Sequence, residues 1–191
     1  MIQHDAGPVL IRRLWPADRA AVEAHFARLD PESRFDRFMG VVSREGVRAY
    51  GASALTRAGL VVGAFLDGEL RGIGELRPAG RATHGLPGEG EAALTVEAPY
   101  RRRGIGTALA RRLCAAARHT GVERLHLRTL AGNRALLGLA ARLGADLSVA
   151  GREAHAVLRL APPTPVSVWA DTLDAAFEAA LAMLSLRPAR I

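Results

Sequence analysis

The hydrophobic and polar positions of this chain divide it into strand-like and helix-like segments. Leu125 to Leu130 alternates apolar and polar residues, which is typical of a half-buried strand. Leu60 to Asp67 and Leu70 to Arg77 flank Asp67-Gly68-Glu69, and this arrangement predicts a hairpin. Further strands are predicted at Val9 to Leu14, Glu91 to Val96, Asp146 to Ala150 and His155 to Leu160.

Helix-like segments lie between these strands. Gly121 and Gly144 provide stop signals for the helices that precede them. Strands outnumber helices at first and alternate with them later, which favours a mixed α/β fold. Helices are predicted at Pro16 to Leu29, Pro31 to Phe38, Ile105 to Thr120 and Asn133 to Gly144, with Ser43 to Ala54 as helix or loop and Pro78 to Gly90 as a loop.

The C-terminal segment follows a proline-rich break at Ala161 to Pro165. A helix is predicted from about Val168 to Leu186, and its apolar residues repeat at helical spacing. This apolar stripe covers either its own domain or a second copy of the chain, and we expect a homodimer. The sequence thus predicts a domain at 1–160, a linker at 161–167 and a C-terminal helix at 168–191.

The segment between Leu94 and Thr107 carries the strongest chemical signal. A β-prone run ends at Pro99, and the chain then reads Arg-x-x-Gly-x-Gly from Arg101 to Gly106 before entering a helix. Glycines at a strand-to-helix turn let backbone N–H groups approach a phosphate, and the positive end of the helix dipole favours an anion there. This segment predicts binding of a ligand that contains a pyrophosphate.

Two common phosphate loops do not fit this segment. The nucleoside-triphosphate loop needs a lysine after its last glycine, and none follows Gly106. The dinucleotide fingerprint needs a third glycine, and Ala108 and Leu109 occupy that region instead. The pattern resembles the coenzyme A loop of the GCN5-related N-acetyltransferases (GNAT), and the later Asn133 and the Leu143-Gly144 pair have the order found in that family.

The GNAT resemblance covers about Val9 to Leu160 and carries several expectations. It implies a mostly antiparallel central sheet flanked by helices, acetyl-CoA as co-substrate, and no metal. It is closest to the type of domain that acetylates protein lysines, through Leu29 to Phe38, Glu91 to Val96 and Asn133 to Leu139. The residues that it implies for the cofactor are Leu94, Val96, Arg101, Arg102, Arg103, Gly104, Ile105, Gly106, Thr107 and Asn133.

Composition narrows the function classes. The net charge is +7, and all 26 basic residues are arginines. Arginine suits phosphate contacts because its fork is bidentate and always charged. The arginines are scattered and only 5% of residues are aromatic, which argues against nucleic acid as the main partner. With one cysteine, Cys114, no signal-like start and no long apolar run, we expect a cytoplasmic protein without membrane partners.

Acetyl transfer to an amine needs a base, because an ammonium group must lose a proton before it attacks a thioester. The resemblance favours Glu91 as the catalytic base, with Glu75 as the next candidate and Glu97 at the wrong end of the cofactor. Two positions differ from common family patterns. Glu75 stands where lysine-modifying relatives usually have arginine, and Ala140 stands where many members have a tyrosine acid.

These residues leave three functions open. The favoured acceptor is a protein lysine, and a small-molecule amine is the alternative within the same reaction. A non-catalytic acyl-CoA sensor is the alternative from another class, favoured by the missing tyrosine and by the extra C-terminal helix.

Overall fold

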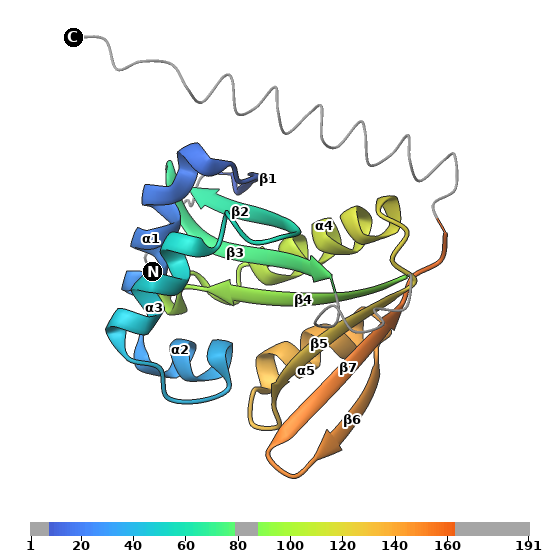
Figure 1. Ribbon diagram of the computed structural model, residues 1–191. Coiled ribbons are helices and arrows are strands. Elements are labelled where there is room, and N and C mark those ends of the chain that lie inside the picture. Colours follow the sequence, from blue (N-terminus) through green and yellow to red (C-terminus); the bar gives the residue numbers. More distant parts are fainter. Residues whose placement is uncertain (1–7, 79–87, 163–191) are drawn as a thin grey trace, which may run out of the picture.

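A sheet of seven strands forms the centre of the described part of the chain, in the order β1-β2-β3-β4-β5-β7-β6. The computed structural model describes residues 8–78 and 88–162 (Figure 1), so most of the expected loop and the expected C-terminal helix lie outside it. The strands are β1 (Leu10–Arg13), β2 (Leu60–Leu66), β3 (Glu69–Pro78), β4 (Glu89–Val96), β5 (Arg124–Leu130), β6 (Asp146–Ala150) and β7 (Glu153–Arg159).

Helices cover both faces of this sheet. One apolar cluster joins α1 and α3 to β2 and β3, and a second joins α4 and α5 to β4, β5 and β7. Figure 1 shows α4 and α5 behind the sheet, with α3 in front of it. The helices are α1 (Arg19–Arg28), α2 (Pro31–Phe38), α3 (Arg44–Ser53), α4 (Ile105–His119) and α5 (Arg134–Arg142), with short 3-10 turns η1 (Pro16–Asp18) and η2 (Ala98–Tyr100).

The mixed, mostly antiparallel architecture is confirmed. All neighbouring strands run antiparallel except β4 and β5, which are parallel. The hairpin between β2 and β3 is also confirmed, since Asp67 and Gly68 both have positive φ, of 52° and 78°. Positive φ at both central residues is the signature of a type I′ turn, whose twist matches that of its strands.

Local capping explains most of the helix boundaries. The segment left open as helix or loop is helix α3, because the Ser43 side chain accepts a hydrogen bond from the Gly46 N–H at 3.0 Å. Asp30 caps α2 in the same way, accepting from the Ser33 N–H at 2.8 Å. Since Asp30 precedes Pro31, it is extended, and Leu29 is already extended with ψ of 130°. The expected helix at Pro16 to Leu29 is therefore η1 followed by α1, which ends at Arg28.

Strand β4 begins two residues earlier than the sequence pattern indicates. Glu89 pairs with Arg124 of β5, and Gly90 pairs with both Pro78 of β3 and Leu125 of β5. These pairings come from residues distant in sequence, so hydrophobic alternation alone does not reveal them. β4 pairs with β5 only from Glu89 to Glu91, so the two halves of the sheet are joined over these three residues alone.

Glu97 lies directly after β4, and its side chain connects the end of β4 to α1 and β3. Its carboxylate is buried and lies 3.1 Å from His25 Nδ1, 3.0 Å from Arg28 Nε and 3.1 Å from Arg71 Nη1. His25 is fully buried, and its Nε2 lies 2.9 Å from the hydroxyl of Thr95. These contacts fix α1 to β3 and to the end of β4, immediately before the glycine-bearing loop.

The buried pair of Glu97 and His25 makes stability depend on pH. Burial alone would raise the pKa of Glu97, but hydrogen bonds and charges from His25 and Arg28 lower it to about 2. Burial is the main cause that lowers the pKa of His25. Glu97 therefore stabilises the fold above its unfolded pKa of about 4.3, and this contribution is lost as the pH falls toward 2. Protonation of His25 in the unfolded chain begins to reduce stability below about pH 6.5.

We expect Glu97→Gln to lower the free energy of unfolding at pH 7 by about 3 kcal/mol, because Arg28 and the mostly buried Arg71 lose the carboxylate that they share. The variant also loses the part of the pH dependence between about pH 4.3 and 2 that Glu97 contributes. Urea unfolding at several pH values measures both effects. Glu69→Gln is the control, since Glu69 pairs with Arg71 but its side chain is 59% exposed. Equal losses in the two variants would contradict this account.

Candidate functional site

The candidate site lies where β4 and β5 separate. The two parallel strands pair only from Glu89 opposite Arg124 to Glu91 opposite His126. Beyond these positions β4 continues to Val96 and β5 to Leu130 without pairing to each other. Figure 1 shows the two strands diverging from a common point, with α2 near the wide end of the opening. The sheet therefore has a wedge-shaped gap between its two halves.

Backbone polar groups of β4 point into this gap. The Glu97 N–H donates to the Arg71 carbonyl of β3 at 3.0 Å, so Glu97 faces away from β5. Because successive residues of a strand direct their backbone groups to opposite sides, Ala92, Leu94 and Val96 face β5 instead. An extended ligand with amide groups would find hydrogen-bond partners there, in the place of a missing strand.

The loop after β4 has the geometry of an anion-binding site. Arg102 and Gly104 have positive φ of 62° and 81°, and α4 begins directly afterwards at Ile105. Within the described residues, the backbone N–H groups from Arg102 to Thr107 donate to no protein acceptor. A Cβ added to Gly104 would have no described atom within 4 Å, so the space in front of this residue is open. Such a run of free donors at a helix N-terminus favours a phosphate.

The three arginines of the loop have different roles. Arg101 turns back into the protein, where its Nη2 donates to the Ser33 hydroxyl at 2.6 Å and its Nε to the Val96 carbonyl at 3.2 Å. Arg102 and Arg103 are exposed, and the Arg103 guanidinium lies 5.5 Å from the Tyr100 ring centre. Arg101 thus ties the loop to α2, whereas Arg102 and Arg103 leave cationic groups near the free N–H groups.

The other expected cofactor residues surround the same opening. Asn133 caps α5, since its Oδ1 accepts from the Leu136 N–H at 3.1 Å. Gly106 lies between two neighbours: a Cβ there would be 3.8 Å from Leu139 of α5 and 4.0 Å from Val96 of β4. Ile105 is a core residue at 2% exposure, so only its backbone reaches the loop surface. Thr107 and Leu94 are half-buried.

Glu91 lies at the point where the strands diverge. Its side chain is exposed, on the face of β4 that also carries Glu89 and Ala93, and it has no hydrogen-bond partner within residues 8–78 and 88–162. Across the sheet it is opposite Arg77 of β3 and His126 of β5. A carboxylate in this position is accessible to a ligand and free to accept a proton.

Glu75, the second candidate base, is buried and hydrogen-bonded, unlike Glu91. It is 1% exposed, and its carboxylate accepts hydrogen bonds from Arg37 at 2.6 Å, Arg77 at 2.7 Å and the Tyr50 hydroxyl at 2.8 Å. Burial raises the pKa of Glu75, but the charges of Arg37 and Arg77 outweigh burial and lower it. The group is enclosed and ionised, and through Arg37 and Tyr50 it joins α2 and α3 to β3.

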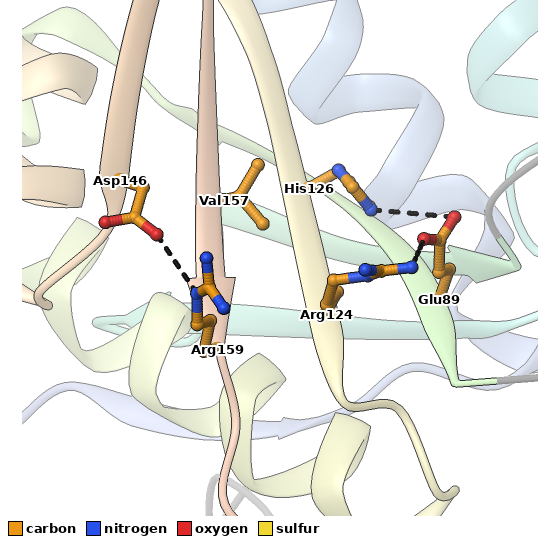
Figure 2. Close-up of a pocket in the computed structure, with 6 residues that line it drawn as sticks. All are labelled: Glu89, Arg124, His126, Asp146, Val157 and Arg159. Atoms are coloured by element: carbon orange, nitrogen blue, oxygen red, sulfur yellow. Dashed lines mark hydrogen bonds and ion pairs between the residues drawn. The ribbon is translucent and has the colours of Figure 1, made fainter.

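The structure contains a histidine pair near Glu91 that the sequence does not predict. His126 Nδ1 of β5 lies 3.0 Å from His155 Nε2 of β7, and the two rings are stacked. An open depression of about 450 Å³ lies beside His126 and is lined by Glu89, Arg124, His126, Asp146, Val157 and Arg159. Figure 2 shows these six side chains. The polar positions of β5 alternate along its sequence, but nothing local indicates that His155 is the partner.

The arrangement combines an anion cradle, a gap with free backbone groups and an accessible carboxylate at its narrow end. The described residues include no group of three histidine, cysteine or acidic side chains that could hold a metal ion. No helix among them is long and apolar enough to cross a membrane. Cys114 is buried, and burial raises the pKa of its thiol.

Comparisons with known proteins agree with this geometry. A model of the acetyltransferase (GNAT) family matches residues 22–145 of the chain. Acetyltransferase PA5475 of Pseudomonas aeruginosa is 30% identical over 144 residues, which are 73% of this chain and 76% of that protein.

Solved structures show the same fold. The GNAT domain of S. lividans PAT has a TM-score of 0.67 at 18% identity, over 84% of this chain and 99% of that domain. The structure of yncA from Salmonella typhimurium, which holds acetyl-CoA, has a TM-score of 0.63 at 18% identity, over 83% of this chain and 99% of that one.

We expect Arg37→Met to lower the free energy of unfolding by about 3 kcal/mol, the low end for a broken buried pair, because Arg77 still faces Glu75. The double variant Arg37→Met/Glu75→Met should recover part of this loss, since it removes both charges together. Chemical unfolding of the single and double variants tests this coupling. A double variant that loses the sum of the two single effects would contradict a shared buried cluster.

Proposed function

Because this chain belongs to the acetyltransferase (GNAT) family, we propose that it transfers the acetyl group of acetyl-CoA directly to a primary amine, with Glu91 as general base. The accessible carboxylate at the narrow end of the β4–β5 gap is the observation that carries this proposal. The family uses acetyl-CoA, and the yncA structure holds this molecule. The favoured acceptor is a protein lysine.

The loop from Arg101 to Thr107 would hold the pyrophosphate of acetyl-CoA. Its N–H groups from Arg102 onward have no protein partners in the described residues, and hydrogen bonds to a charged group contribute about 1.5–3 kcal/mol each. Arg102 and Arg103 add positive charge at the surface, and the hydroxyl of Thr107 lies in the first turn of the helix. Arg101 supports the loop from behind through Ser33.

The gap between β4 and β5 would hold the pantetheine arm. This arm contains amide groups, and the backbone groups of Leu94 and the N–H of Val96 on the gap side have no partner strand, whereas the Val96 carbonyl accepts from Arg101. Asn133 lies at the start of α5, after the end of β5 at the wide side of the gap. The thioester would then lie near the narrow end, where β4 and β5 begin to pair and where Glu91 is located.

The proton balance explains why a base is needed. An ammonium group gives one proton to Glu91, and the neutral amine attacks the thioester carbonyl. As the C–N bond forms and the C–S bond breaks, the nitrogen loses a second proton and the coenzyme A thiolate gains one. Each turnover therefore releases one proton to the solvent. Ala140 occupies the position where many family members have a tyrosine acid, and the thiolate is a sufficiently good leaving group without it.

The acceptor assignment depends on the segment Leu29 to Phe38. This run resembles that of lysine-modifying relatives, and it forms α2 with its cap, beside Arg101 of the phosphate loop. Between the end of α2 and the tips of β5 and β7 lies an open cavity of about 330 Å³, lined by Phe35, Met39, Gly40, Leu130, Arg152 and Glu153. This cavity lies at the wide side of the gap, away from Glu91, so it would contact an acceptor protein outside the position of its reacting amine.

Two alternatives stay with this proposal. A small-molecule amine as acceptor is favoured by Glu75, which stands where lysine-modifying relatives usually have arginine. A non-catalytic acyl-CoA sensor is favoured by the missing tyrosine acid.

The proposed homodimer through 168–191 lies outside the described residues, and a cytoplasmic location is proposed because the reaction consumes acetyl-CoA. Release of free thiol from acetyl-CoA with lysine peptides and with small amines separates these functions.

We expect Gly104→Val to abolish measurable binding of acetyl-CoA in calorimetry, because its side chain would fill the open space in front of the free N–H groups. Gly121→Val is the matched control. Gly121 also has a positive φ, of 77°, and open space around it, but it lies after the far end of α4. Undiminished acetyl-CoA affinity in the Gly104 variant would refute the loop assignment.

We expect Glu91→Gln to leave acetyl-CoA affinity nearly unchanged and to lower turnover at neutral pH by about 10²–10⁴-fold. The loss should shrink as the pH rises, because the acceptor amine then deprotonates without help. Steady-state rates between pH 6 and 10 with one amine acceptor measure this. Glu69→Gln, which removes a 59% exposed carboxylate from β3, is the control. Turnover equal to that of the unaltered chain would show that Glu91 is not the base.

A further inference from the structure

Tyr100 lies at the turn that leads from β4 into the glycine-bearing loop, and it is the last residue of η2. Its N–H donates to the Glu97 carbonyl at 2.9 Å, which fixes the backbone directly before Arg101. Its side chain is half-buried and packs against the apolar cluster that α4 and α5 form with the sheet. The Tyr100 ring therefore has a fixed place at the edge of the anion-binding loop.

One guanidinium group holds this ring from the side of β3. The Arg71 guanidinium lies over the Tyr100 ring, 4.5 Å from its centre, which is within the range of a cation–π contact. Two carboxylates hold Arg71 in turn, Glu69 at 2.7 Å and Glu97 at 3.1 Å. The Arg71 side chain is only 16% exposed, so these contacts are partly shielded from water. Tyr100 is thus attached to the charged cluster around Glu97.

A second guanidinium group, that of Arg103, lies over the same ring, 5.5 Å from its centre. Arg103 is exposed, and its side chain forms no ion pair or hydrogen bond within residues 8–78 and 88–162. Its neighbour Arg102 is also exposed, but it contacts no aromatic ring in that part of the chain. The ring contact therefore distinguishes two arginines that the sequence presents as equivalent.

We propose that Tyr100 is a positioning residue, whose ring holds the Arg103 guanidinium beside the free N–H groups of the loop, where it binds the pyrophosphate of acetyl-CoA. The proposal rests on the proposed function, because it concerns the same ligand and the same loop. Arg102, without a ring contact, would add charge to the loop without a fixed position.

The contact with Tyr100 leaves Arg103 able to bind an anion. The N–H groups of a guanidinium lie in its own plane, so an aromatic ring on its face does not occupy them. An exposed arginine side chain loses rotational freedom when it binds a ligand, and a ring that already restricts the side chain reduces this loss. Tyr100 would therefore strengthen anion binding through Arg103 without contacting the ligand.

The charges around the ring favour an anion next to Arg103. The positive charge of Arg71 is balanced by Glu69 and Glu97, whereas no described carboxylate lies within ion-pair distance of Arg103. The N-terminus of α4 and the free N–H groups from Arg102 to Thr107 add to the same positive potential. A pyrophosphate supplies the negative charge that Arg103 lacks, and its oxygens match the forked donors of an arginine.

The test compares the acetyl-CoA affinity of variants of the full chain by calorimetry. We expect Tyr100→Leu, which keeps an apolar side chain against the core, to weaken binding about two- to fivefold, the range of an exposed cation–π contact. Arg103→Gln should weaken binding about tenfold, because a charged hydrogen bond to the ligand is lost. Adding Tyr100→Leu to Arg103→Gln should cause no further loss, since Tyr100 acts only through Arg103. Tyr100→Phe keeps the ring and should bind like the unaltered chain.

Two controls separate positioning from damage to the loop. Arg102→Gln removes a neighbouring exposed charge that has no ring contact, so Tyr100→Leu should weaken binding by the same factor in this background as in the unaltered chain. S-acetylpantetheine ends before the pyrophosphate. Its affinity, measured by the same calorimetry at high ligand concentration, should be equal in the Tyr100→Leu variant and in the unaltered chain.

Each outcome decides a different point. An unaltered chain that binds no acetyl-CoA overturns the proposed function together with this inference. Acetyl-CoA binding that Tyr100→Leu leaves unchanged overturns the positioning role alone. A loss that persists in the Arg103→Gln background, or that extends to S-acetylpantetheine, shows that Tyr100 acts through packing of the loop and also overturns the positioning role. A loss confined to acetyl-CoA and to chains that retain Arg103 supports the proposal.

Discussion

The site depends on an interruption of backbone hydrogen bonding between two parallel strands. β4 and β5 pair only from Glu89 to Glu91, and each then continues with one edge unpaired. An open edge inside a sheet is costly unless something satisfies its polar groups. Here β4 remains bound to β3 along its length, and β5 remains bound to β7, so each half of the sheet is stable without the other. The gap between them is available to a ligand.

Buried charge clusters hold the helices in place around that gap. Glu97 joins α1 to the end of β4, and Glu75 joins α2 and α3 to β3. Both carboxylates accept hydrogen bonds from several buried or partly buried side chains, whereas Glu91 has no such partner among the described residues. The three lie close together in the sheet: Glu75 on β3, Glu91 on β4 and Glu97 directly after β4. The structure thus distinguishes structural from available carboxylates by their partners. In such a cluster, removal of the carboxylate leaves its arginines without their shared partner, whereas removal of one arginine leaves the other in place.

The sequence predicted those features that depend on neighbouring residues. Asp67-Gly68 has the turn chemistry that the β2–β3 hairpin requires, and Asn133 caps the helix that it precedes. The glycine-bearing loop was recognisable because the turn before α4 places Gly104 at a positive φ of 81°. The contacts between Arg37 and Glu75 and between His126 and His155 join residues far apart in sequence. Strand register determines these contacts, and periodicity does not encode register between distant strands.

Ligand binding at the free N–H groups before α4 would make the stability of the folded chain depend on the ligand concentration. A ligand that binds these groups binds the folded state alone, because the unfolded chain has neither the loop nor the gap. At a concentration of 100 times its dissociation constant, such a ligand adds about 2.7 kcal/mol to the free energy of unfolding. Unfolded chains are the ones that cellular proteases degrade. The abundance of this protein would then follow the abundance of the metabolite that fills its gap.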